Sequence, residues 1–314
     1  MGLKRPLSLL ALAAFTLTGF AQETGTITRS LLHQGRTRTF RLHGGAKVPA
    51  KGAPLLIVLH GGGGNSSQIE RHTGFDEIAD EEGFLVAYPE AVSKHWNDGR
   101  IPDAYPNGQS EVDDVGFLRQ LIAVALQDYS IDPSNVFVCG ISNGGMMAQR
   151  FAQQNASGIN AVASVSGNLG KPWGAELKLT TPVSALLIQG TGDPLMPWSG
   201  GTIRFLGGRA RGEVYGSEEC FDRWGKALEC QNRSAEEPMP DPGSGDSSRP
   251  YRTVSKNPKT GGEVVRVRID GGGHGWPGTS QYLPARLIGN VNQDFQASRE
   301  IWSFFKAHLK GVKQ

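Results

Sequence analysis

Apolar runs alternate with helical patterns along this 314-residue chain, and that alternation most restricts what it can fold into. Residues 54–60 read PLLIVLH, a continuous apolar run of the kind found in strands buried on both faces. Apolar residues at spacings of three and four in 115–129 predict a helix. The sequence predicts strands at 26–32, 37–42, 54–60, 83–89, 136–139, 161–165, 184–189 and 263–269, and helices at 68–81, 115–129, 145–154 and 293–309. This order predicts an α/β fold: a mostly parallel central sheet with helices on both faces, preceded by an antiparallel hairpin.

The first 21 residues have the pattern of a signal peptide. Lys4 and Arg5 precede a mostly apolar stretch at 6–20, and Ala21 completes a site that a signal peptidase could cut. A membrane anchor is the alternative, but the stretch is short for a span of about 20 residues. We therefore expect a secreted or periplasmic protein whose mature chain, 22–314, forms one domain.

Charge and cysteine content restrict the partners. Cleavage after Ala21 would remove two of the 32 basic residues and no acidic residue. The remaining chain would have 30 basic and 30 acidic residues and a net charge near zero. This balance indicates neither nucleic acid nor an anionic membrane as a partner. Cys139 is expected to be buried, whereas Cys220 and Cys230 could oxidise in an exported chain. No Cys-x-x-Cys pair or His/Cys cluster indicates a metal site, and we expect no cofactor.

Two segments interrupt the alternation of strands and helices. Residues 93–112 and 231–251 are polar and rich in turn-forming residues, and few of them are apolar. Such composition does not supply a core of its own. We expect both to be insertions at the rim of the domain.

A serine lies at a sharp corner in VCGISNGGMM, residues 138–147. The strand-like run at 136–139 leads into Gly140, then Ser142, then a helical pattern. Gly-x-Ser-x-Gly recurs by chance in glycine-rich chains and is often only a turn. At a strand-to-helix corner, however, it lifts the hydroxyl clear of the sheet, and the next N–H, from Asn143, opens the helix where it can donate to an oxyanion.

A glycine run follows the strand at 54–60. His60 begins the segment HGGGGN, which can bring backbone N–H groups close to a substrate. A phosphate-binding loop is the alternative, but such a loop would place a lysine after the last glycine, and Asn65 stands there. We expect Gly62 to supply a second oxyanion donor and His60 to orient the loop.

An acid and a histidine follow in the order that this serine needs. Asp193 lies just past the strand at 184–189, and His274 lies in a glycine loop after the strand at 263–269. Each alone could be an ordinary turn residue. Ser142, Asp193 and His274 together follow the order of the nucleophile, acid and base in the α/β-hydrolase fold. The rival acids are Asp113, Asp114 and Asp270, and the rival base is His308.

These motifs resemble the polyhydroxybutyrate depolymerase and feruloyl esterase group of secreted α/β-hydrolases. The resemblance spans about residues 54–278 and includes WNDGR at 96–100, VDDVGFLRQLI at 112–122, GTGDPLMPW at 190–198 and GGGHGWPG at 271–278. It implies a serine carboxylesterase whose catalytic triad is Ser142, Asp193 and His274, with an aromatic residue, here Trp276, bordering the cleft. Gly62 stands where some family members carry a cysteine. Depolymerases that act on solid polyester usually add a linker and a binding domain, for which we expect no counterpart here, so the resemblance does not imply that insoluble polymer is the substrate.

The expected reaction is acyl transfer through an acyl-enzyme. Trp96, Trp198 and Trp276 are candidates for an apolar acyl pocket, although core packing accounts for most tryptophans. The open substrate classes are hydroxyalkanoate oligomers, feruloyl or acetyl esters, and simple short-chain esters. Two other functions remain open: a serine peptidase on the same fold and a polymer-binding relative without catalytic activity.

Overall fold

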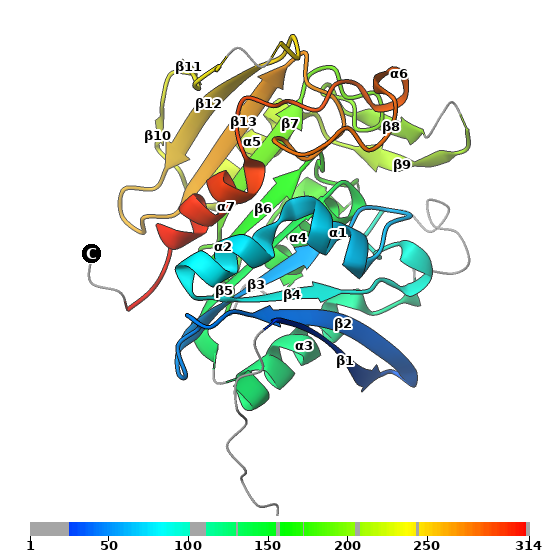
Figure 1. The fold of residues 1–314 in the computed structure, drawn as a ribbon. Coiled ribbons are helices and arrows are strands. Elements are labelled where there is room, and N and C mark those ends of the chain that lie inside the picture. The colour runs from blue at the N-terminus through cyan, green and yellow to red at the C-terminus, as the bar shows by residue number, and fades with distance from the viewer. Residues whose placement is uncertain are drawn as a thin grey trace, which may run out of the picture.

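The computed structural model describes residues 25–100, 111–129, 131–154, 158–171, 173–204, 208–242 and 245–311. The expected signal peptide and half of the 93–112 segment, residues 101–110, lie outside these residues. Within them, an 11-stranded sheet runs through the molecule, and a separate two-stranded ribbon lies beside it (Figure 1).

The sheet has parallel strands at its centre and antiparallel strands at both edges. Its order is β1-β2-β4-β3-β5-β6-β7-β13-β12-β10, with β11 paired to β12, and β8 and β9 form the ribbon. β3, β4, β5, β6, β7 and β13 are parallel neighbours, whereas β1, β2 and β12 pair antiparallel. The strands are β1 (Gly25–His33), β2 (Arg36–Gly44), β3 (Ala53–Leu59), β4 (Leu85–Pro89), β5 (Ile131–Ile141), β6 (Ala161–Val165), β7 (Ser184–Gly190), β8 (Gly201–Arg204), β9 (Ala210–Val214), β10 (Asn232–Arg233), β11 (Glu237–Pro238), β12 (Arg249–Lys256) and β13 (Glu263–Asp270).

Helices cover both faces of this sheet, as the alternation predicted. One face packs against α3, α4 and α5, and the other against α1, α2 and α7. The helices are α1 (Ser66–Thr73), α2 (Phe75–Glu82), α3 (Asp114–Tyr129), α4 (Asn143–Gln154), α5 (Ser217–Ala227), α6 (Ala285–Ile288) and α7 (Ala297–Lys306), with short 3-10 turns at Val92–Lys94 and Trp173–Glu176. In Figure 1, α6, β8 and β9 gather at one end of the sheet, at the upper right.

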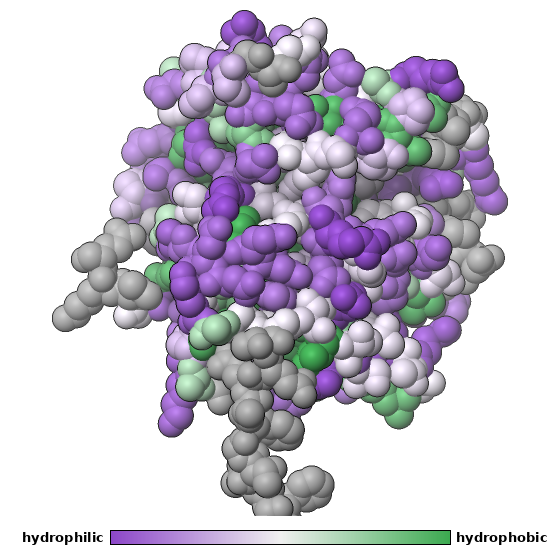
Figure 2. Space-filling view, viewed as in Figure 1, coloured by the Kyte–Doolittle hydropathy of each residue, from purple (hydrophilic) through white to green (hydrophobic). Residues whose placement is uncertain are grey.

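The core divides into two layers because successive strand side chains point to opposite faces. In β3, Leu55, Ile57 and Leu59 pack toward α3 and α4, whereas Leu56 and Val58 pack toward α1 and α2. All five are fully buried, which explains why this segment is apolar without alternation. Outside these layers, the face that carries α1, α2 and α7 is mainly hydrophilic, with small separate hydrophobic areas (Figure 2).

The helix expected at 68–81 is two helices. Gly74 ends α1 in the left-handed conformation, with φ 60°, and its N–H donates to the carbonyl of Glu70. α2 starts at the next residue. Glycine adopts this conformation at little steric cost, so it can end one helix and turn the chain into another.

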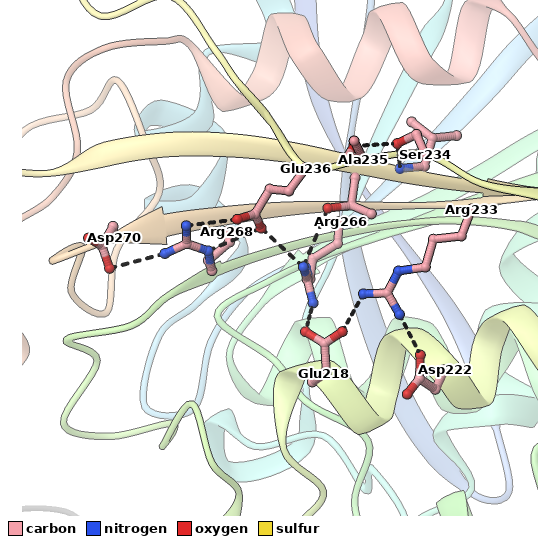
Figure 3. Close-up of polar contacts among 11 residues, drawn as sticks. Glu218, Asp222, Arg233, Ser234, Ala235, Glu236, Arg266, Arg268 and Asp270 are labelled. Carbon is pink, nitrogen blue, oxygen red and sulfur yellow. Dashed lines mark hydrogen bonds and ion pairs between the residues drawn. The ribbon is translucent and has the colours of Figure 1, made fainter.

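In its described part, the polar segment 231–251 extends the edge of the sheet through β10, β11 and the first residues of β12. An ion-pair network fastens it to β13 and α5 (Figure 3). Glu236 accepts from Arg266 at 3.1 Å and from Arg268 at 2.9 Å, and Glu218 pairs with both Arg266 and Arg233. The segment therefore joins the sheet through charged side chains and backbone pairing.

The three cysteines are free thiols. Cys220 is buried beside the backbone N–H of Leu169, at 3.2 Å, and Cys230 donates to the carbonyl of Ser255. Separately, none of the described helices is long and apolar enough to cross a membrane.

Candidate active site

Ser142 lies at a strained corner between β5 and α4. Its φ of 55° is in the left-handed region, which side chains rarely adopt. Its N–H donates to the carbonyl of Val165 at 2.8 Å, which fixes the corner to β6. A Cβ on Gly140 would lie 2.6 Å from the carbonyl carbon of Gly144, and one on Gly144 would collide with the carbonyl of Leu59. Both glycines of Gly-x-Ser-x-Gly are therefore required by close backbone packing.

The glycine loop after β3 lies against this corner. A Cβ on Gly61 would be 3.6 Å from the Cβ of Ser142, and one on Gly62 would be 3.6 Å from the Cβ of Asn143. Asn143 is the first residue of α4, so its N–H is among those that a helix leaves unsatisfied at its N-terminus. The structure thus brings Ser142, Asn143 and Gly62 together.

His60 supports the glycine loop through two backbone contacts. Its Nδ1 is 2.9 Å from the carbonyl of Gly61, and its Nε2 accepts from the N–H of Ala91 at 3.2 Å. This pattern fits a neutral ring protonated on Nδ1. Burial lowers the pKa of His60, only partly opposed by the backbone hydrogen bond and by Glu90. The expected loop-orienting position agrees with this geometry.

The WNDGR segment clamps Asn143 from the other side. Asn143 Oδ1 accepts from the N–H of Trp96 at 2.7 Å, and its Nδ2 donates to the carbonyl of Trp96 and to Asp98. The indole N–H of Trp96 donates to the carbonyl of His60 at 2.9 Å. One tryptophan therefore ties the glycine loop to the start of α4.

Asp193 and His274 meet at the carboxyl ends of β7 and β13. His274 Nδ1 is 2.7 Å from Asp193 Oδ2, and both side chains are almost fully buried. Asp193 Oδ1 accepts from the N–H groups of Leu195 and Met196, each at 2.8 Å. These bonds leave one carboxylate oxygen to orient the imidazole.

The rival residues have other partners. Asp113 Oδ1 caps α3 by accepting from the N–H of Gly116, and Asp114 pairs with buried Arg38. Asp270 is exposed and contacts Thr191, whereas His308 contacts the carbonyl of Phe304. None of them contacts His274 or Asp193 among the described residues.

A cleft of about 700 Å³ joins these pieces, and Ser142, Asn143, Gly62 and His274 all line it. Its volume is in the range typical of small-molecule sites. The other lining residues are His60, Gly61, Gly63, Gly64, Asn65, Gln68, Ile69, Arg71, His72, His95, Arg100, Ile141, Met146, Leu195, Met196, Ile203, Arg204, Arg211, Ser280, Tyr282 and Leu283.

The three tryptophans expected to bind substrate do not line this cleft. Trp96 and Trp276 are fully buried, so neither has surface to offer a ligand. Trp276 packs edge-on against Phe75 and donates to Ser298 at 2.9 Å. Trp198 is partly exposed outside the cleft, and the Arg266 guanidinium lies 5.7 Å from its ring centre. These residues were expected in the cleft because they lie in or beside the family motifs, but a motif does not determine the direction in which a side chain points.

Sequence reasoning missed two cleft residues. Tyr282 is 44% exposed, and its hydroxyl donates to the carbonyl of His274 at 3.2 Å. His95 lies beside the glycine loop, where a Cβ on Gly62 would be 3.1 Å from its Nε2. Both lie in irregular loops far along the chain from Ser142, and no spacing links them to it. Among the described residues, no group of three or more His, Cys, Asp or Glu is placed to hold a metal ion.

Comparisons with known proteins place this chain in a family. The family model described as Esterase PHB depolymerase matches residues 39–176. A protein of Nocardia uniformis subsp. tsuyamanensis named "Putative esterase NocK" is 36% identical over 282 residues, which are 87% of this chain and 80% of that protein. Feruloyl esterase B of Piromyces equi is 28% identical over 245 residues, 74% of this chain but only 42% of that protein.

Solved structures agree with the architecture. An acetyl xylan esterase from Aspergillus awamori superposes with a TM-score of 0.60 at 12% identity, covering 89% of this chain and 99% of that chain. A thermostable esterase superposes with a TM-score of 0.54 at 12% identity, covering 90% and 62%. These likenesses confirm the α/β-hydrolase fold. The chain belongs to the esterase PHB depolymerase family and is a carboxylic ester hydrolase.

Proposed function

We propose that Ser142, His274 and Asp193 form the catalytic triad of this ester hydrolase. The observation that carries the proposal is the 2.7 Å contact between His274 and Asp193 beside the cleft that Ser142 and His274 both line. His274 takes the proton of Ser142 as the hydroxyl oxygen attacks the ester carbonyl. Asp193 holds the imidazole with Nε2 toward the serine and stabilises the imidazolium.

The N–H groups of Asn143 and Gly62 hold the oxyanion. The clamp on the Asn143 side chain and the support of the glycine loop by His60 fix both donors before substrate arrives. Donors that need no reorganisation stabilise the tetrahedral intermediate best, and one such donor contributes about 3–4 kcal/mol. His274 then returns the proton to the leaving alcohol, and water hydrolyses the acyl-enzyme by the same route.

The substrates are esters of hydroxyalkanoate oligomers or feruloyl or acetyl esters. The family description and the relatives' names support this range, since they include a feruloyl esterase and an acetyl xylan esterase. The signal-like N-terminus supports a secreted or periplasmic location. We expect no nucleic-acid partner, because basic and acidic residues are nearly balanced along the chain.

The test compares wild type with Ser142→Ala on p-nitrophenyl butyrate, methyl ferulate and soluble hydroxybutyrate oligomers. The proposal expects kcat/KM to fall by about three orders of magnitude or more in the variant. A folded variant that retains wild-type activity would show that Ser142 is not the nucleophile. Peptide substrates in the same assay separate an esterase from a peptidase, and a serine-reactive phosphonate separates both from a protein that only binds.

A further inference from the structure

Arginines line the cleft, and carboxylates do not. Arg71, Arg100, Arg204 and Arg211 are all on its wall, whereas no Asp or Glu is among its described lining residues. Asp193 lies behind His274, almost fully buried. The described part of the wall around the candidate nucleophile is therefore markedly more basic than the chain as a whole, which has 32 basic and 30 acidic residues.

Two of these arginines have no acidic partner among the described residues. Arg100 does not count toward the free charge, because it pairs with buried Asp98 at 2.7 Å. Arg71, on α1, contacts Ser67 Oγ at 2.5 Å, and Arg204, on β8, donates to the carbonyl of Gly208 at 3.1 Å. Both side chains are exposed, so each guanidinium retains N–H groups for a ligand.

The ring of His95 lies on the oxyanion side of the cleft. His95, whose ring lies next to Gly62, has a pKa lowered first by burial and further by the charges of Arg211 and Arg100, while Ser93 and Asp98 act in the opposite direction. A neutral His95 adds no positive charge of its own. The fixed charges are therefore the arginines.

The same wall offers little aromatic surface. Tyr282 is the one Phe, Tyr or Trp among the described lining residues, and its hydroxyl is already held by the carbonyl of His274. The flat, neutral aromatic acyl group of a feruloyl ester has a single Phe, Tyr or Trp ring to stack on among the described lining residues, whereas an anionic ligand meets charge from two elements. The cleft chemistry thus favours a carboxylate over an aromatic group.

We propose that this enzyme selects esters that carry a free carboxylate, such as hydroxyalkanoate oligomers with an unblocked acid end, and that Arg71 and Arg204 recognise that carboxylate. The inference rests on the proposed ester hydrolysis at Ser142. Guanidinium groups suit the task because their planar N–H donors match the two oxygens of a carboxylate. In a cleft of one charge sign, the field also raises the local concentration of the anion.

The test uses two hydroxybutyrate trimers that differ in one group: a free acid end or a terminal primary amide. We expect kcat/KM for the acid to exceed that for the amide by about tenfold, since exposed charge contacts are individually weak and act here together. The ratio should fall toward one as NaCl rises from about 0.02 M to about 0.5 M. The double variant Arg71→Gln/Arg204→Gln should reduce the ratio to about twofold or less.

Arg36→Gln is the control for loss of a positive charge outside the cleft, because Arg36 is exposed on the β1–β2 hairpin. It should leave the acid-to-amide ratio unchanged. Equal kcat/KM for the two trimers in the wild type, or a ratio that Arg36→Gln lowers as much as the double variant, would overturn the inference while ester hydrolysis stands. Failure of the wild type on both trimers and on p-nitrophenyl butyrate would overturn the proposed function itself.

Discussion

His274 Nδ1 lies 2.7 Å from Asp193 Oδ2, and the backbone joins the two loops that carry them. The N–H of Gly192 donates to the carbonyl of Gly272 at 2.9 Å, one residue before Asp193 and two before His274. The acid and the base are therefore positioned as one unit at the ends of two adjacent parallel strands, β7 and β13.

Asp193→Asn should lower kcat by about 10⁴-fold with little change in fold, because the amide no longer stabilises the tautomer and charge that His274 needs. The measurement is kcat on p-nitrophenyl butyrate. Asp270→Asn is the matched control, since Asp270 ends β13 shortly before His274 in the chain but is exposed and contacts Thr191. If Asp270→Asn lost as much kcat as Asp193→Asn, the assignment of Asp193 as the acid of the triad would be wrong.

Gly62→Ala should lower kcat by about 10–100-fold while KM changes little, because the new methyl group would displace an oxyanion donor. Its Cβ would lie 3.0 Å from Cδ2 of the His95 ring. Removing that ring in Gly62→Ala/His95→Ala should restore part of the lost kcat, and a double-mutant cycle measures the coupling. Additive losses would mean that the collision with His95 is not the cause.

Trp276→Phe should affect stability and not substrate binding. The buried indole N–H donates to Ser298, so its loss should lower the free energy of unfolding by about 1–3 kcal/mol. Denaturant unfolding measures this change, and KM for methyl ferulate should stay within about twofold. Ser298→Ala removes the same hydrogen bond from the other side and should give a similar pattern. A large rise in KM in Trp276→Phe, without one in Ser298→Ala, would show that Trp276 does contact the substrate.

His60 should make stability depend on pH. Burial lowers its pKa in the folded protein below the ordinary value near 6.5, so the unfolded chain binds the proton more readily. The neutral ring therefore contributes to the free energy of unfolding above about pH 6.5. This contribution is lost as the pH falls toward the lowered pKa of the folded protein. The difference in unfolding free energy between wild type and His60→Gln should therefore shrink between about pH 7.5 and pH 5. A difference independent of pH would contradict a neutral buried His60.

The charged network on β13 should respond unequally to loss of its two arginines (Figure 3). Burial lowers the pKa of Arg266 to about 10, and this side chain pairs with Glu218 and Glu236. Arg266→Gln should lower the free energy of unfolding by about 1–3 kcal/mol, because it removes the buried guanidinium that Glu218 and Glu236 share. Arg268→Gln, at a more exposed position, should cost less than about 1 kcal/mol. Thermal melting compares the two, and equal losses would show that burial does not decide the effect.

Local sequence predicted the central elements because their patterns are physical requirements of the fold. The apolar run of β3 and the three-and-four spacing of α3 were interpreted correctly, with bounds Ala53–Leu59 and Asp114–Tyr129. Gly74 was not recognised as a break, since one left-handed residue leaves the hydrophobic period intact. The amphipathic helix α5 is absent from the sequence-based prediction. The strands within 231–251 are absent from it as well, because short polar strands take their stability from pairing partners that the sequence does not reveal.

The order Ser142, Asp193, His274 could be proposed from the sequence alone, because a strand-to-helix corner and loops at strand ends leave local traces. Only the tertiary structure decided which acid meets the histidine. Sheet order places β7 beside β13, and that adjacency selects Asp193 over Asp270, although Asp270 is nearer to His274 in the chain. The tertiary structure also buried Trp96 and Trp276 and brought the arginines of α1 and β8 to one cleft. Side-chain direction depends on packing between distant segments, and no local pattern records it.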